Sequence, residues 1–328
     1  MSQNTVLEIK DLEVELLSEK GPLPVIDKVN LSIKEGEIVG IVGESGCGKS
    51  MLASAIMNLL NSPAQIAAGT IFYEGQDMTT LSTKEFQKIR GNEISMIFQE
   101  PMTSLNPLMK VGKQIEEAIK AHEKVTTAEL KERAIAAIRD VGIPQPEKVY
   151  HDIPSRLSGG MRQRIMIAMA LVCHPKLLIC DEPTTALDVT IQAQILRLIK
   201  KLRDETNTAV IFISHDMGVI YQMVDRVVVM YAGQFVESAP CKKLFEKPLH
   251  PYTIGLQNAI PQINKQQSSL QDIPGSVPML DNLPEGCLFA PRCPFAKSEC
   301  FTKKVPLKHY GDHDVRCLLV DEGGWHNE

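Results

Sequence analysis

Residues 43–50 read Gly43-Glu44-Ser45-Gly46-Cys47-Gly48-Lys49-Ser50, which matches the phosphate-loop pattern G-x-x-x-x-G-K-[ST]. The apolar run 37–42 before it predicts a buried strand, and residues 51–60 after it predict a helix. In this setting the glycines let backbone N–H groups surround phosphate oxygens, and the helix N-terminus adds a partial positive charge. Lys49 is therefore expected to reach the β- and γ-phosphates of a nucleotide, and the Ser50 hydroxyl to bind Mg²⁺.

A second motif, Leu177-Leu178-Ile179-Cys180-Asp181-Glu182, is an apolar strand that ends in two acids. Asp181 is placed to hold the hydration shell of Mg²⁺, and Glu182 to polarise the water that attacks the γ-phosphate. An apolar strand that ends in Asp-Glu is common by itself. Together with the phosphate loop, the pair predicts nucleotide hydrolysis.

The order of the apolar runs predicts an α/β fold with a mainly parallel sheet. Between two of the expected strands lies a helix with one apolar face, because apolar residues recur there at helical spacing. The strands are expected at 37–42, 176–180, 209–214 and 226–231. The apolar face of the helix consists of Ile191, Ile195, Leu198, Ile199 and Leu202.

The middle of the chain, about 91–160, predicts a helical insertion into this core. It has no strong strand pattern after 94–98, and its helix 128–141 begins with a capping box from Thr126 to Glu129. After residue 237 the composition changes to prolines and few apolar runs. We therefore expect one domain over 1–240, with the insertion inside it, and a second domain over 241–328.

The 328 residues carry a net charge of −5 and have a mean hydropathy of −0.07. The negative balance disfavours a nucleic-acid-binding protein, which needs an excess of Lys and Arg. No apolar run reaches the length of a membrane span, and the first ten residues lack the features of a secretory signal. The chain is therefore expected in the cytosol, where its eight cysteines favour thiols or metal ligands over disulfides.

A third motif, 157–164, reads Leu157-Ser158-Gly159-Gly160-Met161-Arg162-Gln163-Arg164. Ser158 is a good helix N-cap, the glycines allow the close approach of another backbone, and a helix follows. Such a terminus is an anion site, although the chain already has a phosphate loop. The motif resembles the signature of ABC ATPases, in which two ATPase domains face each other and the signature of one caps the nucleotide bound by the other. The resemblance covers about 6–237 and implies a P-loop, RecA-like core with an N-terminal antiparallel β part.

The same resemblance assigns further residues to an ATP site. Gln99 lies where the family has a glutamine that contacts Mg²⁺ and senses the membrane partner, and Asp188 ends a loop that links the two ATP sites. His215 matches a histidine that contacts the γ-phosphate. The implied site comprises catalytic Glu182, His215 and Gln99; nucleotide contacts from 43–50, Gln99, Asp181, Ser158, Gly159, Gly160 and Asp188; and Mg²⁺ ligands Ser50, Gln99 and Asp181.

The family usually stacks an aromatic side chain on adenine, and here the sequence departs from the pattern. The corresponding stretch, Val14-Glu15-Leu16-Leu17, offers only aliphatic side chains for that contact. Discrimination between ATP and GTP is therefore expected to be loose, because base stacking contributes to nucleotide affinity.

The C-terminal part is similar to the extension of dipeptide and oligopeptide importer ATPases. The similarity lies in His250-Pro251-Tyr252-Thr253, in Ile273-Pro274-Gly275 and in a group of cysteines, and residues 99–107 also resemble this branch. It implies a subunit at the cytoplasmic face of the cell membrane, paired with a second related ATPase. Two permease subunits and an extracytoplasmic solute-binding protein are the other implied partners. Nickel importers share much of the pattern, so nickel or another small solute is the alternative to peptides.

Four cysteines fall in the last 42 residues, where few apolar residues are available to build a core. Such a segment needs a cross-link or a metal, and the cytosol disfavours disulfides. Zinc usually takes closely spaced cysteine pairs, with histidine as a substitute ligand, whereas four thiolates are the usual ligands of an iron–sulfur cluster. The resembled branch carries a [4Fe–4S] cluster here, so we expect one, with Zn²⁺ as the first alternative and free thiols or disulfides as the second. The cysteines are Cys287, Cys293, Cys300 and Cys317, and the substitute zinc ligands would be His309 and His313.

Three other classes of protein explain less of the sequence. A soluble ABC protein of DNA repair or translation would need basic surfaces, a long coiled coil or two ATPase cassettes. A P-loop ATPase or kinase that works alone leaves residues 157–164 unexplained. A metal-binding regulator that only senses nucleotide has no need of Glu182.

Overall fold

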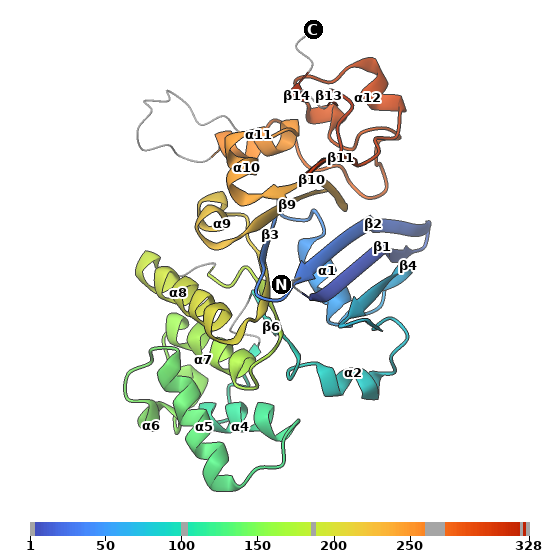
Figure 1. The fold of residues 1–328 in the computed structure, drawn as a ribbon. Helices are drawn as coiled ribbons and strands as arrows, with labels where there is room; N and C mark the ends of the chain where they lie inside the picture. The colour runs from blue at the N-terminus through green and yellow to red at the C-terminus, as the bar shows by residue number, and fades with distance from the viewer. Residues whose placement is uncertain (1–3, 100–103, 185–187, 260–272, 322–323, 326–328) are drawn as a thin grey trace. The chain divides into compact units, whose positions relative to one another are not determined.

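A computed structural model gives the fold of the chain (Figure 1). It describes residues 4–99, 104–184, 188–259, 273–321 and 324–325. Two compact units interleave along the sequence. The helical unit comprises Met1–Leu7, Ile33–Glu37 and Tyr73–Ile211, and the phosphate-loop unit comprises Glu8–Ser32, Ile38–Phe72 and Phe212–Glu328.

The phosphate-loop unit contains a sheet with the strand order β11-β12-β10-β9-β3. β3 (Ile38–Val42) is buried at every residue and runs parallel to β9 (Arg226–Tyr231). β10 (Gln234–Pro240) pairs antiparallel with β9, and β12 (His313–Val315) and β11 (Lys308–Tyr310) continue the antiparallel order. The C-terminal segment therefore extends the sheet whose strand β3 leads into the phosphate loop.

Three longer strands of this unit lie in the order β2-β1-β4. They are β1 (Thr5–Ser18), β2 (Gly21–Lys34) and β4 (Ala64–Tyr73). Buried and exposed residues alternate along the second half of β2, which is typical of a sheet with one face on the core. The helices are α1 (Lys49–Ile56), α9 (Met217–Met223), α10 (Cys241–Glu246), α11 (Pro251–Asn258), α12 (Ser298–Thr302) and the 3₁₀ helix η2 (Ala290–Arg292), followed by the pair β13 (Val320–Asp321) and β14 (Gly324–Trp325).

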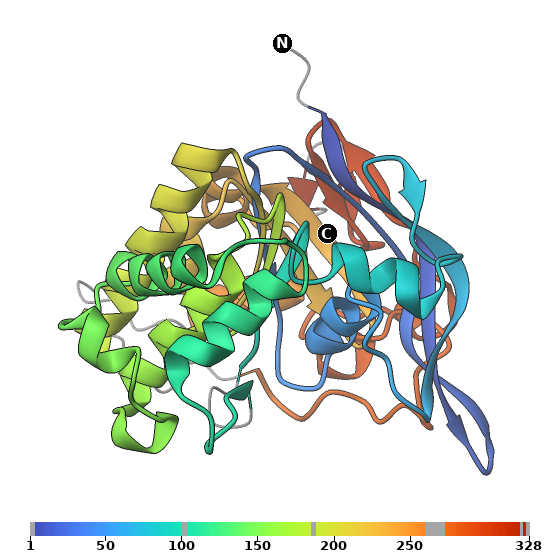
Figure 2. The same cartoon turned by 90° about the horizontal axis from the view of Figure 1, so that it is seen from below.

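The helical unit contains the parallel strands β6 (Ile94–Ile97) and β7 (Leu177–Asp181), with β8 (Ala209–Ile213) beside β7. Every residue of these strands is buried, as expected for the interior of a parallel sheet. Figure 2 shows the green helices α4 to α7 gathered side by side. The remaining elements are β5 (Gln76–Asp77), α2 (Thr83–Ile89), α4 (Val111–Lys120), α5 (Thr127–Asp140), α6 (Pro146–Val149), η1 (Pro154–Arg156), α7 (Gly159–Leu171) and α8 (Val189–Thr206).

The predicted strands correspond to β3, β7, β8 and β9, with bounds that differ by at most one residue at each end. The predicted capping box is also confirmed, because the Thr126 hydroxyl accepts the backbone N–H of Glu129 at 3.3 Å at the start of α5. The helix after the phosphate loop was predicted to reach residue 60, which is wrong: α1 ends at Ile56. Asn58 has a φ of 49°, and a residue in this left-handed conformation ends a helix.

The C-terminal segment is joined to the sheet through a buried carboxylate. Glu237 of β10 accepts the backbone N–H groups of Leu249 at 2.7 Å and His250 at 2.9 Å, and it bonds the Nε2 atom of His313 at 2.7 Å. Strand pairing and this network join the segment to the sheet without a metal ion. The predicted metal-stapled form of the C-terminal part is not confirmed. A small apolar core completes it, made of Leu249, Ala290, Cys300, Val315, Cys317, Leu319 and Val320.

We expect the free energy of unfolding to fall as the pH drops from 6.5 towards 4 because of His250. Burial lowers the pKa of this imidazole from 6.5 to about 4, so the unfolded chain binds a proton that the folded chain does not. The linked loss is about 2 kcal/mol at pH 5. His250→Asn keeps an acceptor for the backbone N–H of Tyr252 but does not titrate, and it should flatten this part of the pH dependence.

Urea unfolding at pH 7 and pH 5 measures the difference directly. A change in stability between the two pH values that is the same for the wild type and His250→Asn would contradict the assignment to His250.

Candidate active site

The phosphate loop connects β3 to α1, and two of its glycines are required by the fold. A Cβ atom on Gly43 would lie 2.2 Å from the carbonyl oxygen of Met230. Gly48 has a φ of 108°, a conformation that L side chains rarely adopt, and a Cβ there would meet the Met230 side chain at 2.8 Å. The close approach of β9 therefore shapes the loop.

Lys49 is the first residue of α1 and is only 6% exposed. Its ammonium donates to the carbonyl oxygens of Gly43 at 2.7 Å and Glu44 at 2.9 Å. The lysine therefore stabilises the backbone of the loop to which phosphate is expected to bind. Gly48, the N-cap, offers no side chain to the first helical N–H groups, which suits an anion at this end. Ser50 is exposed, so its hydroxyl is accessible to a metal ion.

Cys47, also in the loop, is buried with its sulfur 3.7 Å from the Lys49 ammonium. Burial raises the pKa of its thiol, so it is a neutral packing group at neutral pH. A redox role for Cys47 has no support here, because reactive cysteines are exposed and ionised.

The acidic half of the predicted site lies at the ends of β6 and β7. Asp181 ends β7 and is 5% exposed, and Glu182 follows with a φ of 49°. The side-chain amide of Gln99, two residues after β6, donates to the Glu182 carboxylate at 3.1 Å. Parallel pairing of β6 with β7 thus brings together two of the three residues predicted to be catalytic.

The predicted signature segment forms the start of α7. The Ser158 hydroxyl is the N-cap and accepts the backbone N–H of Met161 at 3.3 Å. Ser158 and Gly159 are exposed, and a Cβ atom on Gly159 would meet no atom of the described chain within 4 Å. A Cβ on Gly160 would make only ordinary contact with Ile191, at 3.6 Å. The fold of this chain therefore does not itself require glycine at either position.

Two further predicted residues lie at helix starts. Asp188 is exposed and caps α8, where its carboxylate accepts the backbone N–H of Ile191 at 2.9 Å. His215 is exposed in the short connection between β8 and α9. Residues 100–103 and 186–187, which carried part of the sequence resemblance, lie outside the described residues.

The predicted site residues divide between the two units. Residues 43–50 and His215 belong to the phosphate-loop unit, and Gln99, Ser158–Gly160, Asp181, Glu182 and Asp188 belong to the helical unit. The hydroxyl of Ser50, the carboxylate of Asp181 and the amide of Gln99 supply hard oxygen donors, the ligand type that Mg²⁺ prefers. The donor set thus fits the expected metal.

The four C-terminal cysteines gather in one part of the phosphate-loop unit. Cys300 and Cys317 are buried in its apolar core, and Cys287 packs against that core. Burial, together with the charges of Cys287, Cys293 and Cys300, raises the pKa of the Cys317 thiol to about 12. None of the four is in a disulfide bond.

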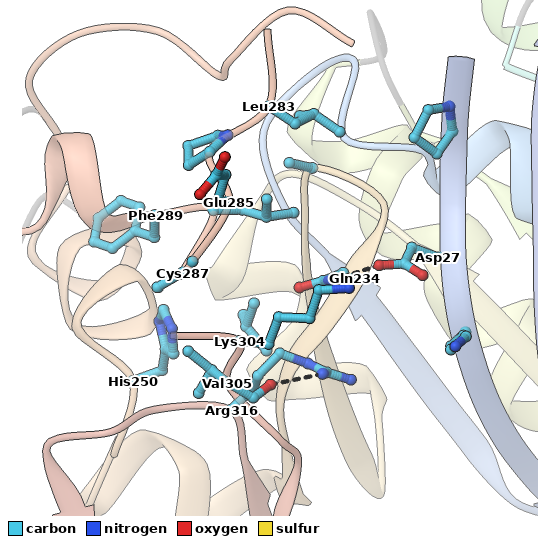
Figure 3. A pocket seen from close by; sticks show the side chains of 17 residues that line it. Asp27, Gln234, His250, Leu283, Glu285, Cys287, Phe289, Lys304, Val305 and Arg316 are labelled. Atoms are coloured by element: carbon cyan, nitrogen blue, oxygen red, sulfur yellow. Dashed lines mark hydrogen bonds between the residues drawn. The ribbon is translucent and has the colours of Figure 1, made fainter. Parts of the chain in front are cut away.

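A cavity of about 340 Å³ lies beside Cys287 (Figure 3). Cys287, His250 and Phe289 line one side of it, and Asp27 and Gln234 face them from the other. At its wall the Arg316 guanidinium donates to the carbonyl oxygens of Val305 at 2.9 Å and Phe235 at 3.2 Å.

No metal centre is confirmed in the described residues, because no three or more His, Cys, Asp or Glu side chains there are grouped to hold a metal ion. The two histidines considered for zinc have other partners. His313 bonds the buried Glu237, and Nδ1 of His309 lies 2.7 Å from the Asp314 carboxylate.

Two contacts to the phosphate loop were not predicted from the sequence. The Arg292 guanidinium forms an ion pair with Glu44, and the Tyr252 hydroxyl accepts the backbone N–H of Glu44. Tyr252 lies in the motif 250–253, and Arg292 lies between Cys287 and Cys293. The spacing of these motifs gave no sign that they meet the loop.

Comparisons with known proteins show which family the chain is similar to. The ABC transporter family model matches residues 26–185, and the model of the oligopeptide/dipeptide transporter C-terminal region matches residues 236–300. Oligopeptide transport ATP-binding protein AppD of Bacillus subtilis is 50% identical over 98% of each chain. Dipeptide transport ATP-binding protein DppD of Haemophilus influenzae is 44% identical over 95% of this chain and 94% of its own.

The fold is similar to that of solved ATP-binding cassettes. The dimeric cassette MJ0796, in a post-hydrolysis state bound to ADP and Pi, has a TM-score of 0.66 and 28% identity, and the match covers 72% of this chain and 98% of that one. No helix among the described residues is long and apolar enough to cross a bilayer. The two family models and the high identity to full-length relatives establish that the chain belongs to the ABC transporter family, among the ATP-binding proteins that carry the oligopeptide/dipeptide transporter C-terminal region.

Proposed function

We propose that the chain is the ATP-binding and ATP-hydrolysing subunit that powers the import of dipeptides or oligopeptides. The observation that carries this proposal is the combination, in one chain, of a phosphate loop and a C-terminal region of the oligopeptide/dipeptide transporter type. Import of nickel or another small solute is the alternative. A soluble ABC ATPase outside transport is less well supported, because it has no use for that C-terminal region.

Each polar residue of the site has a role in this reaction. The backbone of 43–50 and the Lys49 ammonium hold the phosphates, and bound Mg²⁺ neutralises charge on the β- and γ-phosphate oxygens. Ser50, Asp181 and Gln99 would hold this ion through their oxygen atoms. Glu182 accepts a proton from the attacking water, and the hydrogen bond from Gln99 fixes the direction of its carboxylate. His215 contacts the γ-phosphate.

The signature segment serves a second chain. Gly159 is exposed, and a Cβ atom there would enter open space, so the fold of this chain does not explain the glycine. A phosphate group bound to another chain would need that space, and this explains why the position has no side chain. Ser158, Gly159 and Gly160 therefore cap the ATP held by a partner ATPase, and Asp188 lies in the loop between the two ATP sites. The ATPase domain spans 1–240, with its helical subdomain at about 91–160, and the extension spans 241–328.

The complex consists of this chain, a second related ATPase, two permease subunits and an extracytoplasmic solute-binding protein. The chain lies at the cytoplasmic face of the membrane and reaches it only through the permeases. ATP binding closes the two ATPases and hydrolysis reopens them, which is a ligand-driven shift between two arrangements.

Uptake by intact cells separates the peptide function from the nickel alternative. Cells whose only copy carries Lys49→Ala should lose uptake of a labelled tetrapeptide and keep wild-type uptake of nickel. Loss of nickel uptake with normal peptide uptake would contradict the proposal and support the alternative. Lys124→Ala, at an exposed position of the helical unit away from the phosphate loop motif, is the control for the removal of one lysine charge.

The proposal includes a [4Fe–4S] cluster held by the four C-terminal cysteines, with Zn²⁺ as the alternative. It is supported by the number of thiols and by the packing of Cys287, Cys300 and Cys317 in or against one small apolar core. Anaerobically purified protein should be brown and contain about four iron atoms per chain. Cys287→Ser should lose most of this iron, whereas Cys173→Ser, in the helical unit, should keep it. Stoichiometric zinc without iron would contradict the cluster and support the zinc site. The absence of both metals would contradict both metal sites.

A further inference from the structure

Glu44 places a carboxylate in the phosphate loop, directly after Gly43. A negative side chain at this position opposes the binding of a nucleotide triphosphate, because like charges repel strongly where water is partly excluded. In the structure the carboxylate is paired. Both of its oxygens accept hydrogen bonds from the Arg292 guanidinium, at 2.6 and 2.9 Å, in the bidentate geometry that gives the strongest ion pairs.

Arg292 is held in place independently of Glu44. Its side chain is 5% exposed, and it donates to the carbonyl oxygens of Pro274 at 2.8 Å and Ile273 at 3.3 Å. The guanidinium also lies 5.8 Å from the ring centre of Tyr231 and 5.9 Å from that of Phe289. The arginine is therefore preorganised, so little side-chain entropy is lost when it meets Glu44.

A second contact fixes the backbone of the same loop residue. The N–H of Glu44 donates to the Tyr252 hydroxyl at 2.8 Å, and the Tyr252 ring packs edge-on against Tyr231 at 4.7 Å. Each of the three C-terminal motifs thus has a member in this cluster: Tyr252 from 250–253, the carbonyl oxygens of 273–274, and Arg292 from the cysteine segment. Tyr252 and Arg292 contact Glu44 directly, and the carbonyl oxygens of Ile273 and Pro274 hold Arg292.

We propose that Arg292 is a positioning residue for nucleotide binding, which neutralises and holds Glu44 so that the C-terminal extension sets the affinity of the phosphate loop for ATP. Loss of the guanidinium leaves the Glu44 carboxylate unpaired beside the phosphates and frees the loop at that point. The proposal rests on the proposed function only in that ATP binds residues 43–50.

The test is equilibrium binding of Mg-ATP to the full chain by calorimetry. Arg292→Gln should weaken binding about tenfold, or about 1.4 kcal/mol. The double variant Arg292→Gln with Glu44→Gln removes both charges and should bind within about threefold of wild type, which equals about 0.65 kcal/mol. Arg292→Lys keeps the charge and should lose less affinity than Arg292→Gln. The defect of Arg292→Gln should also shrink at high salt, because it arises from charge repulsion.

Two outcomes would overturn the proposal: wild-type affinity in Arg292→Gln, or a double variant that binds no better than Arg292→Gln alone. The second outcome would mean that the arginine only supports folding. Lys243→Ala breaks an exposed ion pair with Asp312 in the same C-terminal region and should leave affinity unchanged. Lys49→Ala separates the two claims, because wild-type affinity in that variant would refute ATP binding by the loop rather than the role of Arg292.

Discussion

Replacement of Glu182 by Gln is expected to slow ATP hydrolysis in the assembled complex by about 10²–10⁴-fold while ATP still binds. The substitution removes the carboxylate that accepts the proton of the attacking water. It leaves the phosphate loop untouched, because the loop is shaped by β9 and braced by Lys49. The rate of phosphate release should therefore fall while the affinity for Mg-ATP stays at the wild-type value. Both quantities are measured on the same preparation.

Glu147→Gln is a matched control for this change. Glu147 is an exposed glutamate of the helical unit whose partner is Arg139 on the surface, and exposed ion pairs of this kind contribute little to stability. Its hydrolysis rate should equal that of wild type. Turnover of Glu182→Gln at close to the wild-type rate would remove Glu182 from the catalytic role.

Gly159→Asp is expected to leave the chain folded and to reduce hydrolysis in the complex about a hundredfold or more, since like charges brought together at an interface cost several kcal/mol. A side chain at this exposed position meets no atom of the described chain within 4 Å, so folding has no reason to fail. The new carboxylate would face the phosphates bound by the partner ATPase. ATP binding to the isolated chain should be unchanged, because that site is formed by residues 43–50.

Thr127→Asp is the matched control, because Thr127 is also the first residue of a helix and also exposed. It adds the same charge at the start of α5 and should leave the rate of the complex unchanged. If Gly159→Asp instead lowers the melting temperature strongly, or if the complex hydrolyses ATP normally, the two-chain site is contradicted.

The sequence predicted the elements around the phosphate loop well because their signals are local. β7, β8 and β9 are short runs in which nearly every residue is apolar and buried, and such runs mark the interior of a parallel sheet. The contact between Gln99 and Glu182 follows from the same pattern. Both residues follow strands that pair in parallel, so their side chains meet at one edge of the sheet.

The contacts of the C-terminal segment could not be predicted because they join residues far apart in sequence. Arg292 and Glu44 are 248 positions apart, and neither stands in a pattern that names the other. β11 and β12 have three residues each, too few for an alternating pattern to be recognised. The end of α1 was missed for a different reason: a left-handed asparagine stopped a helix that the apolar pattern continued.

The central claim is that this chain couples ATP hydrolysis to the import of peptides. It is tested most directly by reconstituting the complete complex in proteoliposomes, with the solute-binding protein outside and ATP inside, and measuring peptide uptake and phosphate release together. We expect labelled peptide to accumulate only with ATP, phosphate release to rise when the peptide-loaded binding protein is added, and both to stop with Glu182→Gln. Accumulation of peptide without phosphate release, or release that does not respond to peptide, would contradict the account.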